Sequence, residues 1–109
     1  MTVYVDNAAI PYGRMKMHHM VADSTEELYR MVDSIGVQRR WIQNRGSYRE
    51  HFDISAQKRL QAIVYGAVDV TAQQLAAMVR RRQHTGSLGK PVDAIAWYDE
   101  YLAKLRESE

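Results

Sequence analysis

Residues 2–23, TVYVDNAAIPYGRMKMHHMVAD, decide the fold because they place two strand-like runs on either side of a Pro-Tyr-Gly-Arg turn. Thr2–Asp6 alternates in the manner of a β-strand, and Met15–Ala22 is a second run with a high apolar content. The loop of residues 7–14 is too short for a parallel crossover, which needs roughly a dozen residues. We therefore expect the two runs to pair as antiparallel strands.

Helix signals follow these strands at three places. Ser24-Thr-Glu-Glu27 and Thr71-Ala-Gln-Gln74 both match the capping-box pattern, and Gly36 stands where a helix C-terminal glycine belongs. Asp53 or Ser55 can cap a helix that lies between the other two. The apolar residues that we expect these helices to bury are Leu28, Met31, Val32 and Ile35 in the first, Leu60, Ile63, Val64 and Ala67 in the second, and Leu75, Met78 and Val79 in the third.

Two more short runs complete the expected sheet. Val37–Gln43 is predicted as a third strand and Val68–Val70 as a short fourth one. A third strand that follows a helical crossover would run parallel to Met15–Ala22. The expected fold class is α/β, with a small mixed sheet of three to four strands, helices packed on it, and a C-terminal helix.

The C-terminal quarter of the chain is expected to stand apart from an α/β domain over residues 1–84. Residues 85–90 are rich in glycine and predict a linker, and Pro91 is well placed to open a helix over residues 91–109. This helix carries one apolar stripe, and a second stripe of Trp97 and Tyr101 that is offset from it. Two stripes favour a homodimer contact, although the helix can equally fold back on its own core with the aromatic residues at the rim. The first stripe consists of Ile95, Tyr98, Leu102 and Leu105.

Composition narrows the classes of function. The chain has 109 residues, a net charge of +2 and no cysteine, so disulfides, thiolate nucleophiles and cysteine-based zinc sites are excluded. A polynucleotide-binding protein usually has a clearer basic excess. No apolar run approaches the ~18 residues of a membrane span, and the strand pattern starts too early for a signal peptide. We therefore expect a cytoplasmic protein with no membrane partner.

Basic and aromatic residues point to an anionic ligand. Tyr12 and Arg14 lie on the first loop, and Arg39 and Arg40 lie at the start of the predicted third strand with Trp41 beside them. Arginine binds phosphate in bidentate fashion, and aromatic faces stack on nucleobases. In the alternative interpretation the two strand arginines only block edge aggregation and the tryptophan is core. The predicted ligand-binding residues are Asp6, Tyr12, Arg14, Arg39, Arg40, Trp41 and His51, the last beside a helix N-terminus.

A metal site is a competing interpretation. Asp6, His19, Asp23, His51 and Asp53 offer nitrogen and oxygen ligands that suit zinc or manganese. However, His18 and His19 should point to opposite faces of a strand, and antiparallel pairing should place Asp6 and Asp23 at opposite ends of the sheet. We therefore predict no metal and no cofactor, with Asp53 as a helix cap and His19 as a hydrogen-bonded strand residue.

Sequence signatures of catalysis are missing. No serine stands in a Gly-x-Ser-x-Gly elbow, and Gly86-Ser-Leu-Gly89-Lys90 lacks the spacing and the preceding strand of a phosphate-binding loop. These observations favour a binding protein over an enzyme.

Seven motifs in residues 2–70 connect the chain with other proteins. They are Tyr4-Val5-Asp6, Pro11–Met15, His19–Asp23, Ile35-Gly36-Val37, Arg39-Arg40-Trp41, His51-Phe52-Asp53-Ile54 and Lys58-Arg59. Their order and spacing resemble an uncharacterised family of small bacterial and phage domains, and this resemblance implies no established activity.

Three hypotheses of function follow. The first is a small protein that binds a nucleotide-like anion and, if phage-encoded, sequesters a nucleotide signal of host immunity. The alternatives are a metal-dependent phosphoesterase or nuclease, and a protein-interaction module that acts through the helix of Trp97 and Tyr101.

Overall fold

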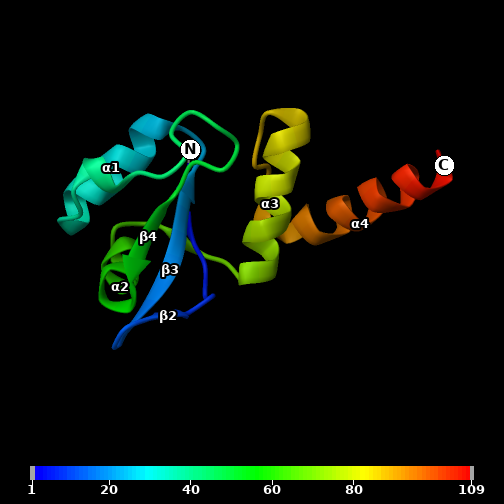
Figure 1. The fold of residues 1–109 in the computed structure, drawn as a ribbon. Coiled ribbons are helices and arrows are strands. Elements are labelled where there is room, and N and C mark those ends of the chain that lie inside the picture. Colours follow the sequence, from blue (N-terminus) through cyan, green and yellow to red (C-terminus); the bar gives the residue numbers. More distant parts are fainter. Residues whose placement is uncertain (1, 109) are drawn as a thin grey trace.

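The structure is a computed structural model that describes residues 2–108, and it contains a mixed five-stranded sheet (Figure 1). The strand β3 is central, and it pairs antiparallel with β1 and β2 along one edge and with β4 along the other. β5 pairs parallel with β1, which makes the sheet mixed. The predicted α/β class and the predicted antiparallel pairing of the first and second runs are thus confirmed. The strands are β1 (Val3–Val5), β2 (Ile10–Tyr12), β3 (Met15–Ala22), β4 (Phe52–Ser55) and β5 (Val68–Asp69).

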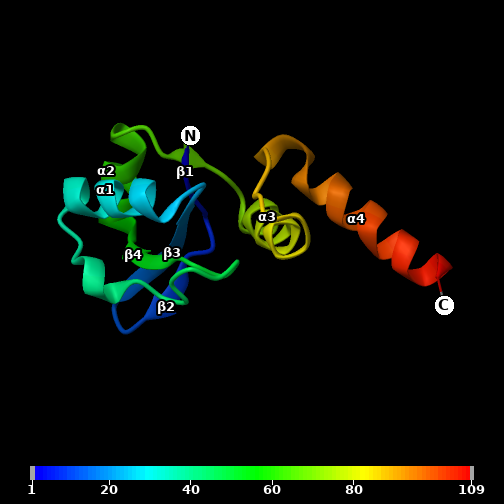
Figure 2. The same cartoon turned by 90° about the horizontal axis from the view of Figure 1, so that it is seen from above.

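Helices cover both faces of this sheet. The core residues of α1 and α2 pack against one face, and those of α3 pack against the other. α4 packs on α3 and then extends away from the rest of the molecule, as Figure 2 shows. No helix among residues 2–108 is long and apolar enough to cross a membrane. The helices are α1 (Thr25–Ile35), the short 3-10 helix η1 (Arg39–Trp41), α2 (Ala56–Val64), α3 (Ala72–Thr85) and α4 (Pro91–Glu107).

The helix boundaries follow the local sequence signals. The side chains of Ser24, Ser55 and Thr71 each accept a hydrogen bond from a backbone N–H in the first turn of α1, α2 and α3. Gly36 ends α1 in the left-handed conformation with a φ of 75°, which a residue with a Cβ adopts only at a cost. Pro91 stands in the first turn of α4. Short-range side-chain chemistry therefore sets most of the helix ends.

The strand predicted over Val37–Gln43 is wrong. The chain forms η1 there, with Arg39, Arg40 and Trp41 all exposed. The place expected for this strand beside β3 is taken by β4, which runs antiparallel to β3. The physical reason is burial: Phe52 and Ile54 alternate along β4 and fill the core, whereas none of the η1 side chains is buried.

The buried side predicted for α2 is also partly wrong. Leu60 and Val64 are 61% and 83% exposed, whereas Ile63 and Ala67 pack against the core as predicted. Ala62, which was not predicted to be buried, is the fully buried residue of α2. Lys58 lies on the inner side, where its ammonium group donates to the carbonyl of Ile35 over 2.6 Å at the end of α1. The hydrogen bond of Lys58 to the end of α1 therefore helps to determine which face of α2 is turned inward.

The segment between α3 and α4 is a tight connection. Leu88 is buried in the core beside α3, and the guanidinium group of Arg81 donates to the carbonyls of Leu88 and Lys90 over 2.9 and 2.7 Å. On α4, the rings of Trp97 and Tyr101 stack on each other at 5.3 Å, and the Tyr101 ring lies 4.4 Å from His84 of α3. The second aromatic stripe is therefore partly covered within one chain. The homodimer stays a prediction.

Candidate functional site

A row of polar side chains crosses the sheet on the face toward α3. Asp6 directly follows β1, His19 lies beside it on β3, and Asp53 is the register partner of His19 on β4. Alternate residues of a strand point to opposite faces, and the apolar sequence neighbours of these three residues fill the core beneath α1 and α2. His51 precedes Asp53 by two residues and therefore shares its face. We call Asp6, His19, His51 and Asp53 the His-Asp cluster.

Asp6 anchors the cluster and is only 2% exposed. Its carboxylate accepts hydrogen bonds from the backbone N–H groups of Ala8 and His19 and from Nδ1 of His19, the last over 2.7 Å. Its carbonyl accepts from Nε of Arg59 and from Nδ1 of His18. Burial raises the pKa of Asp6, but these bonds from His19 and Ala8 lower it by more, so the carboxyl pKa lies below its ordinary value. Asp6 is therefore a fixed, ionised acceptor.

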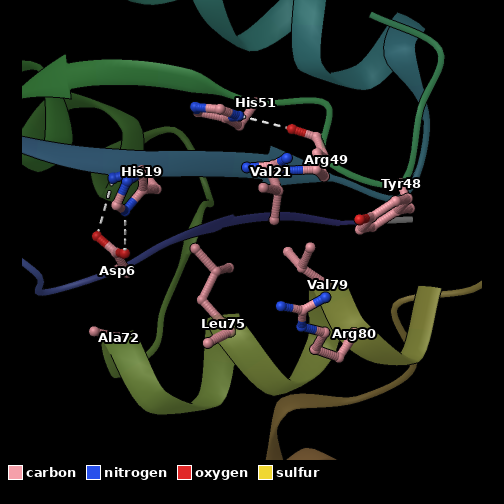
Figure 3. Close-up of a pocket in the computed structure, with 11 residues that line it drawn as sticks. Asp6, His19, Val21, Tyr48, Arg49, His51, Ala72, Leu75, Val79 and Arg80 are labelled. Atoms are coloured by element: carbon pink, nitrogen blue, oxygen red, sulfur yellow. Dashed lines mark hydrogen bonds and ion pairs between the residues drawn. The ribbon is translucent and has the colours of Figure 1, made fainter. Parts of the chain in front are cut away.

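His19 is oriented by this acceptor, as Figure 3 shows. The hydrogen bond to Asp6 raises the pKa of His19, burial opposes that effect, and the negative charges of Asp6 and Asp53 reinforce it. With Nδ1 donating to Asp6, the other ring nitrogen, Nε2, is directed toward Oδ1 of Asp53 at 3.9 Å. The ring thus presents one defined nitrogen to its surroundings.

His51 approaches the same carboxylate oxygen from the loop that leads into β4. Its Nδ1 donates to the carbonyl of Arg49 over 2.7 Å, because a carbonyl can only accept. Its Nε2 lies 3.4 Å from Oδ1 of Asp53. The other oxygen of Asp53 accepts from the Gln43 side chain over 2.7 Å. The two imidazole Nε2 atoms therefore converge on one carboxylate oxygen.

A cavity of about 490 Å³ opens beside the cluster, between α3 and the sheet. Val21 of β3 and Leu75 and Val79 of α3 give it an apolar floor (Figure 3). Tyr48 and Arg49 line it from the loop before β4, and Arg80 lines it from α3. Asp6, His19 and His51 complete the polar end. The cavity therefore combines an apolar surface, one aromatic ring and several nitrogen donors.

Arg82 fixes the loop that carries Tyr48 and Arg49. Its guanidinium group donates to the carbonyls of Tyr48, Ala22 and Glu50 over 2.8 to 3.2 Å, and so joins α3, β3 and this loop. Burial lowers the pKa of Arg82, while the charges of Glu50 and Asp23 oppose that effect. The rim of the cavity is therefore held in place by a partly buried arginine.

Only two of the seven sequence-predicted ligand residues line this cavity, namely Asp6 and His51. Tyr12 and Arg14 lie on and beside β2, in the turn that joins it to β3, where both are exposed. A parallel third strand would have placed Arg39 and Arg40 at the same end of the sheet as Arg14, but residues 2–108 form no such strand.

The remaining three predicted ligand residues form η1. Arg39 makes a bidentate ion pair with Asp33 at 2.7 and 3.0 Å and covers the ring of Tyr29. The guanidinium group of Arg40 stacks over Trp41, which is exposed. These contacts leave the three residues outside the cavity, each with a partner from its own neighbourhood.

Sequence reasoning did not select Tyr48, Arg49 or Arg80. As functional residues, His19 and Asp53 were considered only as members of a metal site that also contained Asp23. The prediction of Asp53 as a helix cap is wrong, because it lies on β4 and Ser55 caps α2, whereas His19 is a hydrogen-bonded strand residue as predicted. Asp23 lies at the opposite end of β1 from Asp6, as predicted, where it pairs with the backbone of Thr2. The alternation of polar and apolar residues over His51–Ile54 was the signal that could have identified β4.

The comparison with protein families adds one finding. A family model described as a protein of unknown function (DUF4031) matches residues 3–82. The chain belongs to this family. The matched region contains the sheet, the whole His-Asp cluster and the residues that line the cavity, and it ends before α4. No curated protein and no solved structure matches the chain.

Proposed function

We propose that this protein binds a small phosphorylated molecule, of about nucleotide size, in the cavity between α3 and the sheet. The observation that carries the proposal is the combination of a cavity of about 490 Å³ with an apolar floor and two arginines at its wall. Ligand pockets typically have roughly 300–1,000 Å³, mostly apolar walls and a few convergent polar groups.

The chemistry of the wall fits each part of such a ligand. Arg49 and Arg80 approach the cavity from the loop and from α3, and arginine forks match phosphate oxygens. Tyr48 offers an aromatic face for a planar ring, and Leu75 and Val79 offer apolar contact. The ligand class is the one expected from the sequence, but the proposed place differs from the predicted surface of Tyr12, Arg14 and residues 39–41.

A biological role would follow from tight binding without turnover. Sequestration of a nucleotide signal of host immunity by a phage protein stays a prediction for that role. It requires that the bound molecule be recovered unchanged after release, which distinguishes sequestration from the phosphoesterase alternative.

The test compares arginines at the two places. Metal-free protein is titrated calorimetrically with cyclic and linear adenine and guanine nucleotides and with pyrophosphate. Loss of one charge-assisted hydrogen bond costs about 1.5–3 kcal/mol, so Arg49→Gln and Arg80→Gln should each weaken binding at least tenfold. Arg14→Gln and Arg40→Gln are the matched controls and should bind as the wild type does.

Two results would contradict the proposal. One is a loss of affinity in the Arg14 and Arg40 variants but not in the cavity variants, which would move the site to the predicted surface. The other is the absence of any saturable binding in the wild-type protein, checked by an unchanged melting temperature.

A further inference from the structure

We propose that Nε2 of His19, Nε2 of His51 and Oδ1 of Asp53 form a binding site for one divalent transition-metal ion, with zinc as the reference ion. The site lies at the polar end of the cavity, but it rests on side-chain geometry that is independent of the proposed nucleotide binding. Two imidazole nitrogens and one carboxylate oxygen are a donor set that such ions accept, with further positions open to water or substrate.

The first argument is that both rings are already in the required tautomer. Nδ1 of His19 donates to Asp6, and Nδ1 of His51 donates to the carbonyl of Arg49, both over 2.7 Å. In the neutral ring this leaves the lone pair on Nε2, which is the atom that faces Asp53 in each case. No ring flip is needed before the two nitrogens can coordinate.

The second argument is that every donor has an outer partner. Metal-bound histidines nearly always donate their other N–H to a carboxylate or a carbonyl, and bound carboxylates are themselves hydrogen-bonded. Asp6 serves His19, the Arg49 carbonyl serves His51, and the Gln43 amide holds the second oxygen of Asp53 over 2.7 Å. An outer hydrogen-bond partner for each of the three donors is the arrangement expected of a metal site rather than of a simple surface ion pair.

The third argument concerns distance. Ligands about 2.0–2.1 Å from a tetrahedral zinc ion lie about 3.3 Å from one another. The separation of His51 Nε2 and Asp53 Oδ1 is 3.4 Å, which matches, while that of His19 Nε2 and Asp53 Oδ1 is 3.9 Å. As the side chains stand, no three His, Asp or Glu residues within residues 2–108 are placed to hold an ion. His19 Nε2 and Asp53 Oδ1 therefore have to approach each other by about 0.6 Å before one ion can bind both atoms.

The closing movement is available to Asp53. Its side chain is 38% exposed and lies on β4, which is an edge strand of the described sheet. Rotation of its carboxylate toward His19 needs no change in the core, because the inward-facing neighbours Phe52 and Ile54 stay in place. His19 itself is held by Asp6 and serves as the fixed side of the site.

The test uses the full-length protein after dialysis against a chelator. Zinc is titrated by calorimetry, and cobalt is followed through its visible absorption, which reports coordination by the protein. We expect one ion per chain, and at least a hundredfold weaker binding in His51→Ala and in Asp53→Ala. His84→Ala is the matched control, because this histidine packs against α4 away from the cluster, and it should bind zinc as the wild type does. Circular dichroism and urea unfolding confirm that each variant is folded.

Asp6→Asn tests the positioning of His19. Loss of an outer partner typically weakens metal binding 10–100-fold without removing a ligand, so this variant should bind zinc more weakly but still at one ion per chain. Its cobalt spectrum should keep the intensity of the wild type at saturation.

The proposal is overturned if the wild-type protein shows no saturable uptake of zinc or cobalt, in which case the three side chains form an ion-pair network only. It is equally overturned if uptake is unchanged in both His51→Ala and Asp53→Ala. Arg80→Gln separates this proposal from the proposed function, since it should weaken nucleotide binding and leave zinc affinity unchanged.

Discussion

The two faces of the sheet differ in how completely they are covered. On the side of α1 and α2, Val5, Met20 and Phe52 are fully buried, and the core is continuous. On the side of α3, Tyr4 and Val21 are buried beneath the helix, but Asp6 and His19 at the other end of the same strands adjoin an open cavity. One face of the sheet therefore supplies a closed core that stabilises this small domain, while the other face leaves a cavity beside polar side chains.

Small residues explain the room beneath α3. Ala72 and Ala76 line the cavity where larger side chains would fill it, and Leu75 and Val79 form only its floor. The helix is fixed at its first residue, where the backbone N–H of Ala72 bonds to the Asn7 side chain over 2.9 Å. α3 therefore stays close to the cluster without covering it.

The largest expected effect compares large-to-small substitutions on the two faces. Phe52→Ala should reduce the free energy of unfolding by about 3–5 kcal/mol, because it opens a void in a closed core. Leu75→Ala should cost less, about 2 kcal/mol, because Leu75 already borders a cavity that water can enter. Urea unfolding of both variants checks this. Equal reductions in the free energy of unfolding would show that the two faces of the sheet contribute equally to stability.

A second comparison uses two arginines of α3 that differ by two positions. Arg82→Gln should reduce the free energy of unfolding by about 2–3 kcal/mol, because it leaves the partly buried carbonyls of Tyr48 and Glu50 without their charged donor. Arg80→Gln removes an exposed side chain and should change the free energy of unfolding by about 0.5 kcal/mol or less. Thermal and urea unfolding measure both. An unchanged free energy of unfolding in Arg82→Gln would mean that water molecules replace the hydrogen bonds of the Arg82 guanidinium group.

Local signals in the sequence predicted the helices of the fold. The caps at Ser24, Ser55 and Thr71, the glycine at 36 and the proline at 91 act within one helical turn, so each can be recognised without tertiary information. The antiparallel pairing of β1 and β3 also follows from the short segment between them, although this segment, expected as a loop, contains β2.

Long-range pairing was not predictable in the same way. Which segment pairs with the free edge of β3 depends on the burial of Phe52 and Ile54, and Asp53, which lies between them, was interpreted as a helix cap. Because residues 37–43 were interpreted as the third strand instead, the predicted ligand site included Arg39 and its neighbours. Once β4 is placed, the alternation of its side chains brings His51 and Asp53 to the cluster.

The smallest expected effect concerns α4, which contacts the α3 side of the molecule and has no counterpart on the other face. Val92 and Leu105 are exposed along it, so we still expect a homodimer with this helix at the contact. Trp97→Ala combined with Tyr101→Ala should shift the protein toward the monomer. Apart from the loss of buried apolar area, the double substitution should reduce the free energy of unfolding by only about 0.5–1.5 kcal/mol, which is the usual contribution of a stacked aromatic pair. Light scattering of both proteins at matched concentration measures the shift. A wild-type monomer at high micromolar concentration would show that the contact with His84 is all that this aromatic stripe provides.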